Sequence, residues 1–182
     1  MHWALINGEK SHGISVHEMS EDYDAGPIIW QGKVAITQAL RVAALRELLI
    51  QKLEQHFPKV LNRIISNDFK TIRNTVKDGS YWPPRTPADS KITQWNDSPS
   101  IYRLVKTLSG EGNPAYLVYN ENKALVITDA ELEQSSKKPI KTPVILEKKQ
   151  YKLVIQMPDQ YLLHLYFEPE ADLTNFKIDF SL

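Results

Sequence analysis

The chain of 182 residues contains no cysteine, has no net formal charge and has no apolar run long enough to span a bilayer. The lack of cysteine excludes disulfides, zinc sites built from thiolates and a cysteine nucleophile. Because each half of the chain is also close to neutral, the sequence predicts no basic surface for nucleic acid or for an anionic membrane. The N-terminus lacks the basic and apolar segments of a signal peptide, so we expect a cytoplasmic protein.

The first third of the chain alternates between helical and extended patterns. Residues 2–9 have the apolar spacing of a helix end, and extended segments are predicted at residues 14–16 and 28–36. A long helix is predicted over residues 37–67, with the threonine at its start as the N-cap. Pro58 lies inside this helix and should kink it or split it in two.

The remainder of the chain changes first to a linker and then to β structure. Prolines and turn-forming residues predict a linker over residues 78–99, and Ser98-Pro99 begins a helix that should end at Gly110. Five short strands follow, which suggests a small barrel or sandwich. We expect these strands at residues 115–119, 124–128, 143–147, 151–157 and 162–167, with a hairpin loop at residues 120–123.

The most informative segment for chemistry is Gly13 to Ile29, which reads as a strand, an acidic turn and a second strand. The turn places Asp24 beside Gly26, and a carboxylate there can act as a general base or hold an imidazole in one tautomer. The alternative is a solvated turn in which Asp24 bonds its own backbone. His12 and His17 flank the first strand without a metal-binding spacing, and the sequence contains no glycine-rich phosphate loop.

Four tyrosines in the β region also have two interpretations. They could stack on the bases of a nucleotide, or they could complete the packing of the small strands. These residues are Tyr116, Tyr119, Tyr161 and Tyr166.

Four segments, in this order, carry a resemblance to a known family. They are Trp3-Ala-Leu-Ile-Asn-Gly-Glu9, Gly13-Ile-Ser-Val-His-Glu-Met19, Asp24-Ala-Gly-Pro-Ile-Ile29 and Trp82-Pro-Pro-Arg-Thr-Pro-Ala-Asp-Ser-Lys-Ile92. Together they resemble the formyltransferases that use 10-formyltetrahydrofolate. The resemblance extends over most of the chain and keeps the order of the family's motifs.

The resemblance implies an α/β fold in two parts. Residues 1–79 would be the C-terminal part of a Rossmann-like formyltransferase domain, and residues 80–97 would be a proline-rich linker. Residues 98–182 would be a C-terminal helix followed by a small β-barrel-like domain of the OB type.

The resemblance also implies a site and a cofactor. Asp24 would be the catalytic aspartate, and Asp24, Ala25, Gly26 and Ile28 would contact 10-formyltetrahydrofolate, the formyl donor, with no metal. The family's catalytic Asn and His would lie upstream of Met1, so His2 and His17 do not replace them. We therefore expect the chain alone to be inactive.

The acceptor and the partners are expectations of the same kind. We favour a nucleotide-linked amino sugar as the primary amine, with methionyl-tRNA as the second choice, and no membrane partner. Without an upstream half, the strands near Ile14 and Ile28 should have apolar edges that favour homodimers or self-association. The alternatives are a non-catalytic module that binds a nucleotide or a protein, and the remnant of a truncated enzyme.

Overall fold

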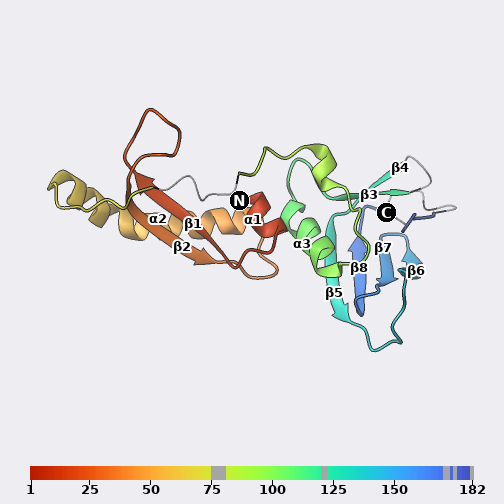
Figure 1. The fold of residues 1–182 in the computed structure, drawn as a ribbon. Helices are drawn as coiled ribbons and strands as arrows, with labels where there is room; N and C mark the ends of the chain where they lie inside the picture. Colours follow the sequence, from red (N-terminus) through yellow and green to blue (C-terminus); the bar gives the residue numbers. More distant parts are fainter. Residues whose placement is uncertain (75–80, 120–122, 170–172, 174–175, 181–182) are drawn as a thin grey trace.

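The structure is a computed structural model that describes residues 1–74, 81–119, 123–169, 173 and 176–180. The molecule is elongated: a hairpin and a long helix form one end, and a mostly antiparallel β unit forms the other (Figure 1). Some helices and strands form as the local sequence pattern predicts, and the presence or bounds of others depend on packing.

A short helix and a hairpin begin the chain, as the residue pattern predicts. Helix α1 (His2–Ile6) is followed by strand β1 (Ser11–His17) and strand β2 (Ile28–Ala35). The two strands are antiparallel, and their register shifts between Val16 and His17, where Ile29 forms a bulge in β2. Such a bulge redirects the side chains at the end of a strand.

Helix α2 (Val42–Ile65) covers one face of the hairpin. The predicted start at Thr37 is wrong, because the helix begins five residues later, after Arg41 in an extended conformation. The Leu40 amide instead donates to the Thr37 carbonyl, which closes a turn and lets Leu40 pack against the buried side chains of α2. Packing of an apolar side chain therefore decides where the helix begins.

Pro58 does not split α2, which continues without interruption to Ile65. A proline in a helix cannot donate to the carbonyl four residues earlier, here that of Glu54. Both Pro58 and Glu54 are exposed, so water can bond the free carbonyl. Of the two predicted outcomes, the split is therefore wrong, and the kink stays a prediction.

The segment between α2 and the β region is fixed to the N-terminal helix. The Trp3 indole donates from Nε1 to the Pro83 carbonyl at 2.8 Å, and its ring stacks on Trp82 with a centroid separation of 5.2 Å. Within this predicted linker, residues Pro87–Ser90 form the short 3-10 helix η2. Helix α3 (Ser98–Leu108) then begins at Ser98, as predicted, with the Asp97 carboxylate accepting from the Ser100 amide at 3.0 Å.

The β region contains two sheets. Strands β3 (Tyr116–Tyr119) and β4 (Lys123–Val126) form a hairpin, whose predicted loop lies largely outside the described residues. The four-stranded antiparallel sheet has the order β5-β8-β7-β6. Its strands are β5 (Asp129–Gln134), β6 (Val144–Lys149), β7 (Lys152–Gln156) and β8 (Tyr161–Tyr166).

Strand β5 was not among the five predicted strands. Its sequence is Asp-Ala-Glu-Leu-Glu-Gln, in which Ala130 is buried and Leu132 packs against the core, while the alternating residues Asp129, Glu131 and Glu133 are acidic. A strand with two small or moderate apolar residues resembles a polar loop when only composition is considered. Pairing with β8 along its whole length makes it a strand.

The buried apolar side chains form two clusters. One contains Val42, Leu45 and Leu49 of α2 and Leu5 of α1, and the other fills the space between α3 and the β strands. The predicted division into residues 1–79, 80–97 and 98–182 stays a prediction. None of the helices within the described ranges is long and apolar enough to cross a bilayer.

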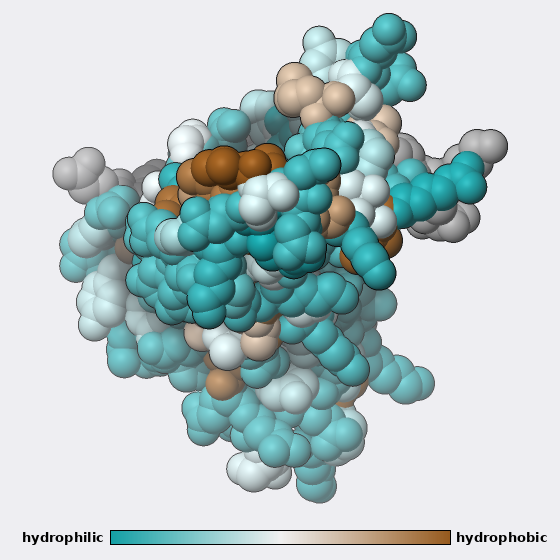
Figure 2. Space-filling view, turned by 90° about the vertical axis from the view of Figure 1, so that its left-hand side faces the viewer, coloured by the Kyte–Doolittle hydropathy of each residue, from teal (hydrophilic) through white to brown (hydrophobic). Residues whose placement is uncertain are grey.

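The end of the molecule formed by the hairpin and α2 exposes apolar surface, and we predict that it self-associates. Among the described residues, β1 pairs only with β2 in their sheet, and one stripe of α2 is exposed: Ile50, Phe57, Leu61 and Ile65. Figure 2 shows an apolar area bordered by polar side chains at this end.

Light scattering should detect dimers or larger species of the wild-type chain. Leu61→Lys should reduce them, whereas Gln55→Lys, which adds the same charge elsewhere on α2, should not. A monomeric wild-type chain at high concentration would contradict the prediction.

The buried imidazole of His164 predicts loss of stability in acid. Burial, followed by the charge of Lys152, lowers its pKa from 6.5, and the carboxylates of Glu131, Glu133 and Glu147 oppose this effect. The unfolded chain therefore binds more protons than the folded chain just below pH 6.5, so the free energy of unfolding should fall as pH falls through that value. Denaturant titrations at several pH values should show a smaller fall for His164→Gln. An identical pH dependence in both proteins would exclude this origin.

Candidate functional site

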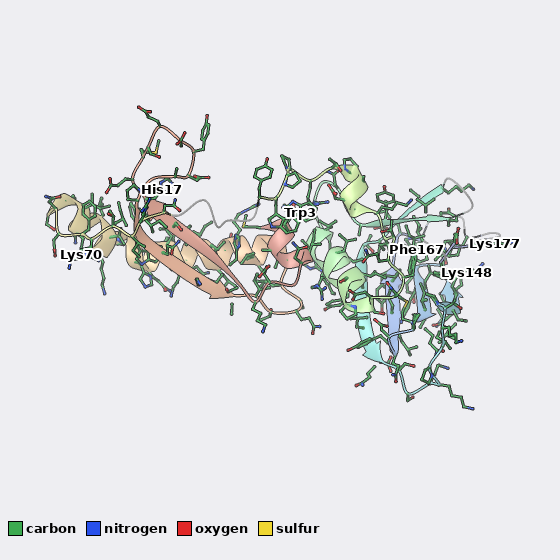
Figure 3. The ribbon with its side chains drawn as sticks, viewed as in Figure 1. Trp3, His17, Lys70, Lys148, Phe167 and Lys177 are labelled. Carbon is green, nitrogen blue, oxygen red and sulfur yellow. The ribbon has the colours of Figure 1, made fainter. Side chains whose placement is uncertain are left out.

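The candidate site is the loop between β1 and β2, residues 18–27, which projects from the end of the hairpin (Figure 1). His17 lies at the base of this loop, far from Trp3 at the middle of the molecule (Figure 3). The base is closed by the Glu18 amide, which donates to the Pro27 carbonyl at 3.0 Å. Two further bonds between the backbones of Ile28 and Ile72, each 2.8 Å, attach the segment after α2 to the hairpin.

The main chain of Asp24 is held in place, and its side chain is exposed to solvent. Its φ of 54° lies in the left-handed region, which aspartate tolerates better than most residues. The Asn74 side chain donates from Nδ2 to the Asp24 carbonyl at 2.6 Å. The Asp24 side chain is 98% exposed, so its carboxylate faces solvent while its main chain is held in place.

His17 is the side chain that meets the Asp24 carboxylate. Its Nε2 lies 3.6 Å from Asp24 Oδ1, and its Nδ1 lies 2.7 Å from the Glu18 carbonyl oxygen. The imidazole is three-quarters buried at the register shift, opposite the bulge of β2. The structure therefore brings together a histidine and an aspartate that the sequence separates by seven positions.

Gly26 makes this arrangement possible. A Cβ at residue 26 would lie 1.8 Å from the Glu18 carbonyl oxygen and 3.2 Å from His17 Nδ1. Two atoms cannot approach to 1.8 Å without a covalent bond, so any side chain here would force the loop apart. Ala25 and Ile28, the other predicted contact residues, are half-buried next to Gly26 and at the start of β2.

The rest of the loop is acidic and exposed. Met19 and Tyr23 are large apolar side chains with 92% and 100% of their surface exposed. Within the described ranges, no group of three His, Asp or Glu side chains is arranged to hold a metal ion.

The sequence predicted an acidic turn with Asp24 beside Gly26, and the structure confirms that Asp24 lies at a turn there. The roles of Asp24, Ala25, Gly26 and Ile28 stay predictions. Sequence analysis missed His17 and Asn74 as neighbours of Asp24. The His17 contact lies where the register of β1 and β2 shifts, and the Asn74 contact joins residues 50 positions apart.

The β-region tyrosines mostly serve packing. Tyr119 is buried with its ring 4.8 Å from that of Phe176, and the Tyr166 hydroxyl donates to Glu131 Oε2 at 2.8 Å. Both contacts are internal, which favours the packing interpretation for these two residues.

Comparison with protein families places the loop inside a matched region. Residues 1–61 match the sequence profile of a family described as "Formyl transferase". The matched region contains α1, the β1–β2 hairpin with the Asp24 loop, and most of α2.

Comparison with solved structures shows a fold similar to that of formyltransferases. An N-formyltransferase from Helicobacter canadensis, determined with folinic acid and dTDP-3-aminofucose, is 18% identical with a TM-score of 0.69. The alignment covers 91% of this chain and 59% of that protein. The sugar 3N-formyltransferase WlaRD, determined with dTDP and 5-N-formyl-THF, is 18% identical with a TM-score of 0.68, covering 93% and 59%.

A third structure shares the fold within a longer protein. HypX from Aquifex aeolicus, in complex with tetrahydrofolic acid, is 20% identical with a TM-score of 0.60, covering 90% of this chain and 28% of that protein. The chain thus spans less than two thirds of the length of each of these three proteins. At these identities the likeness shows a shared mixed α/β fold.

Gly26→Ala tests whether the loop needs a residue without a side chain. Because the added Cβ would overlap the Glu18 carbonyl, the variant should lose about 1–3 kcal/mol of unfolding free energy, or its loop should be cleaved faster by protease. Gly112→Ala is the matched control, since a Cβ there meets nothing within 4 Å. Equal stability and equal cleavage of the two variants would contradict the geometry.

Proposed function

We propose that the chain, whose residues 1–61 match the formyl transferase family, forms part of an enzyme that transfers a formyl group from 10-formyltetrahydrofolate to a primary amine. The observation that carries the proposal is the position of the Asp24 loop within the matched segment, on a hairpin held rigid at its base. Folates are bound in the structures of the Helicobacter canadensis enzyme and HypX, which supports a folate donor.

The finer features of the fold belong to the same proposal. Residues 1–79 would be the C-terminal part of a Rossmann-like catalytic domain, residues 80–97 a linker, and residues 98–182 a barrel-like domain of the OB type. The two separate clusters of buried side chains support this division. The β3–β4 hairpin and the four-stranded sheet would supply the wall of the barrel.

The proposed reaction defines what the protein must supply. A neutral amine attacks the formyl carbon, a C–N bond forms, and a tetrahedral intermediate carries negative charge on oxygen. The bond from that carbon to N10 of the folate then breaks, and N10 receives the proton that the amine gives up. Donors must stabilise the oxyanion, and a base must move the proton.

Asp24 is suited to assist the movement of the proton. We propose that it orients a catalytic histidine and assists the proton transfer, while an Asn and that His come from a segment upstream of residue 1. The exposed carboxylate supports this assignment of roles, since a second group can reach it from the solvent side of the loop. The same turn, Asp24 to Gly26 with Ile28, would contact the pterin of the donor.

A nucleotide-linked amino sugar is the proposed acceptor. The Helicobacter canadensis structure contains dTDP-3-aminofucose and the WlaRD structure contains dTDP. The neutral charge of the chain supports a small acceptor over methionyl-tRNA, because binding of the many backbone phosphates of a nucleic acid normally requires an excess of Lys and Arg. The alternative, a non-catalytic module, would bind a nucleotide sugar without any dependence on folate.

Formyl transfer should depend on Asp24 in a form of the protein extended upstream by a segment with the Asn-x-His motif. With 10-formyltetrahydrofolate and a dTDP-linked amino sugar, the extended protein should form the N-formyl sugar, and residues 1–182 alone should not. Asp24→Asn should lower kcat/KM by about 100-fold or more, the usual contribution of acid–base groups.

Asp22→Asn is the matched control, because it removes an exposed carboxylate from the same loop and should leave the rate within about twofold of wild type. An extended protein that transfers no formyl group to any amine would refute the proposed function. Full activity of Asp24→Asn would refute the role of Asp24.

A further inference from the structure

We propose that the pocket between α1, α3 and the end of β2, the junction pocket, binds a small organic carboxylate, with the Arg103 guanidinium as its charged anchor. Its walls come from α1, from the connection after α1, from the turn after β2 and from α3. It lies at the end of the hairpin opposite the Asp24 loop (Figure 1). The inference concerns a second site, so it does not depend on the proposed function of that loop.

The junction pocket is a small cavity with one apolar side. Its volume is about 270 Å³, just below the range of about 300–1,000 Å³ that is usual for drug-sized ligands. Leu5, Ile36 and Leu40 form the apolar side, and all three belong to the cluster packed around α2. The Ile36 amide donates to the Lys10 carbonyl at 2.9 Å, which holds the main chain of Lys10 beside this apolar side. The space therefore suits a small ligand that has an apolar part.

Arg103 is a half-buried cation with no carboxylate partner in the described part of the chain. Its Nε donates to the Ile6 carbonyl at 3.2 Å, and its Nη2 donates to the Ser100 hydroxyl oxygen at 2.6 Å. The Ser100 hydroxyl itself donates to Asp97 Oδ2 at 2.6 Å, so both acceptors of Arg103 are neutral groups. A guanidinium has five N–H donors, which leaves three without a partner among the described residues. Because a half-buried charge is normally paired, and a guanidinium matches the geometry of a carboxylate, the unfilled partner of Arg103 is an anion.

The other charged side chains of the junction pocket leave one excess positive charge. Lys106 is already paired, because its Nζ lies 2.6 Å from Asp129 Oδ1. Lys10 is exposed and has no ion pair among the described residues, and Glu9, the carboxylate that lines the pocket, has none either. Arg103 and Lys10 therefore outnumber Glu9 by one charge. This balance favours a carboxylate with a single charge over a phosphate with two.

A ligand in the junction pocket would contact both ends of the molecule. Lys10 and the apolar side belong to the hairpin and the turn after it, whereas Arg103 belongs to α3, which packs against the β unit. A carboxylate bound between them would strengthen the attachment of the hairpin to the β unit. Because it binds only the folded chain, it should also raise the midpoint of thermal unfolding as its concentration rises.

Benzoate is the probe for this site, and benzamide, which has a similar shape without the charge, is its control. In NMR titrations of the chain of residues 1–182, benzoate should give saturable shifts with a dissociation constant of about 1–10 mM. Its ring protons should contact the methyl groups of Leu5, Ile36 and Leu40. Benzamide should bind about tenfold more weakly, because it cannot form a charge-assisted bond with Arg103. Benzoate shifts that do not saturate, or equal binding of benzamide, would overturn the proposal.

Substitutions of Lys10 test the charge of the pocket without disturbing a buried side chain. Lys10→Gln should weaken benzoate binding by about threefold and Lys10→Glu by about tenfold, because they remove one and two units of positive charge. Lys33→Gln is the matched control: it removes an exposed lysine from β2 of the same hairpin, outside the pocket, and should leave the affinity unchanged. Equal effects of Lys10→Gln and Lys33→Gln would contradict a site at this position.

Arg103→Lys keeps the positive charge and removes the planar fork, so it should weaken benzoate binding by about tenfold. Arg103 also bonds the Ile6 carbonyl, so the wild-type chain supplies a second measurement that does not depend on the stability of this variant. There the side-chain nitrogen resonances of Arg103 should shift with benzoate and not with benzamide. Unmoved resonances would refute the role of Arg103, and tighter binding of inorganic phosphate than of benzoate would refute the assignment to a carboxylate.

Discussion

The attachment of helix α1 to two separate cores is the constraint on which the rest of the structure depends. Leu5 packs with the side chains of α2, and the next residue, Ile6, packs against the cluster beneath α3. Arg103 of α3 donates from Nε to the Ile6 carbonyl at 3.2 Å, which ties the end of α1 to the β region. Gly8, with φ of 71°, leaves room for the Arg103 side chain, since a Cβ there would lie 3.1 Å from Nε. One turn of helix thus relates the hairpin to the β unit.

This attachment lies at the end of the hairpin opposite the Asp24 loop. β1 starts at Ser11, close to α1, and its seven residues end at His17, a span of about 20 Å at 3.3 Å per residue. The loop is therefore remote from the β unit, and its own short contacts must determine its geometry. The Glu18–Pro27 bond, the Ile28–Ile72 pair and the Asn74 contact perform that task within the described residues. The loop can be rigid while its outer surface stays open.

Much of the fold could be predicted from local pattern, and the errors have physical causes. The apolar spacing of α2 and the Asp97-Ser98-Pro99 start of α3 are local signals, and both helices are present. Strand β5 was missed because its existence depends on pairing with β8, which is distant in sequence. In the site, motif order pointed to Asp24 and Gly26. Motif order could not show that the ring of His17 lies next to Asp24, because His17 stands at a register shift that depends on the pairing of β1 with β2.

The exposure of Asp24 follows from the same geometry. A carboxylate buried among carbonyls would pay a desolvation cost without a partner, whereas one on an open loop keeps its hydration until a ligand arrives. The protein fixes the Asp24 main chain in the left-handed region and opposes one oxygen with His17, so orientation does not require burial. A second group that approaches from the open side then meets a carboxylate with a defined direction. A rigid base and an exposed carboxylate are therefore mutually consistent features of this loop.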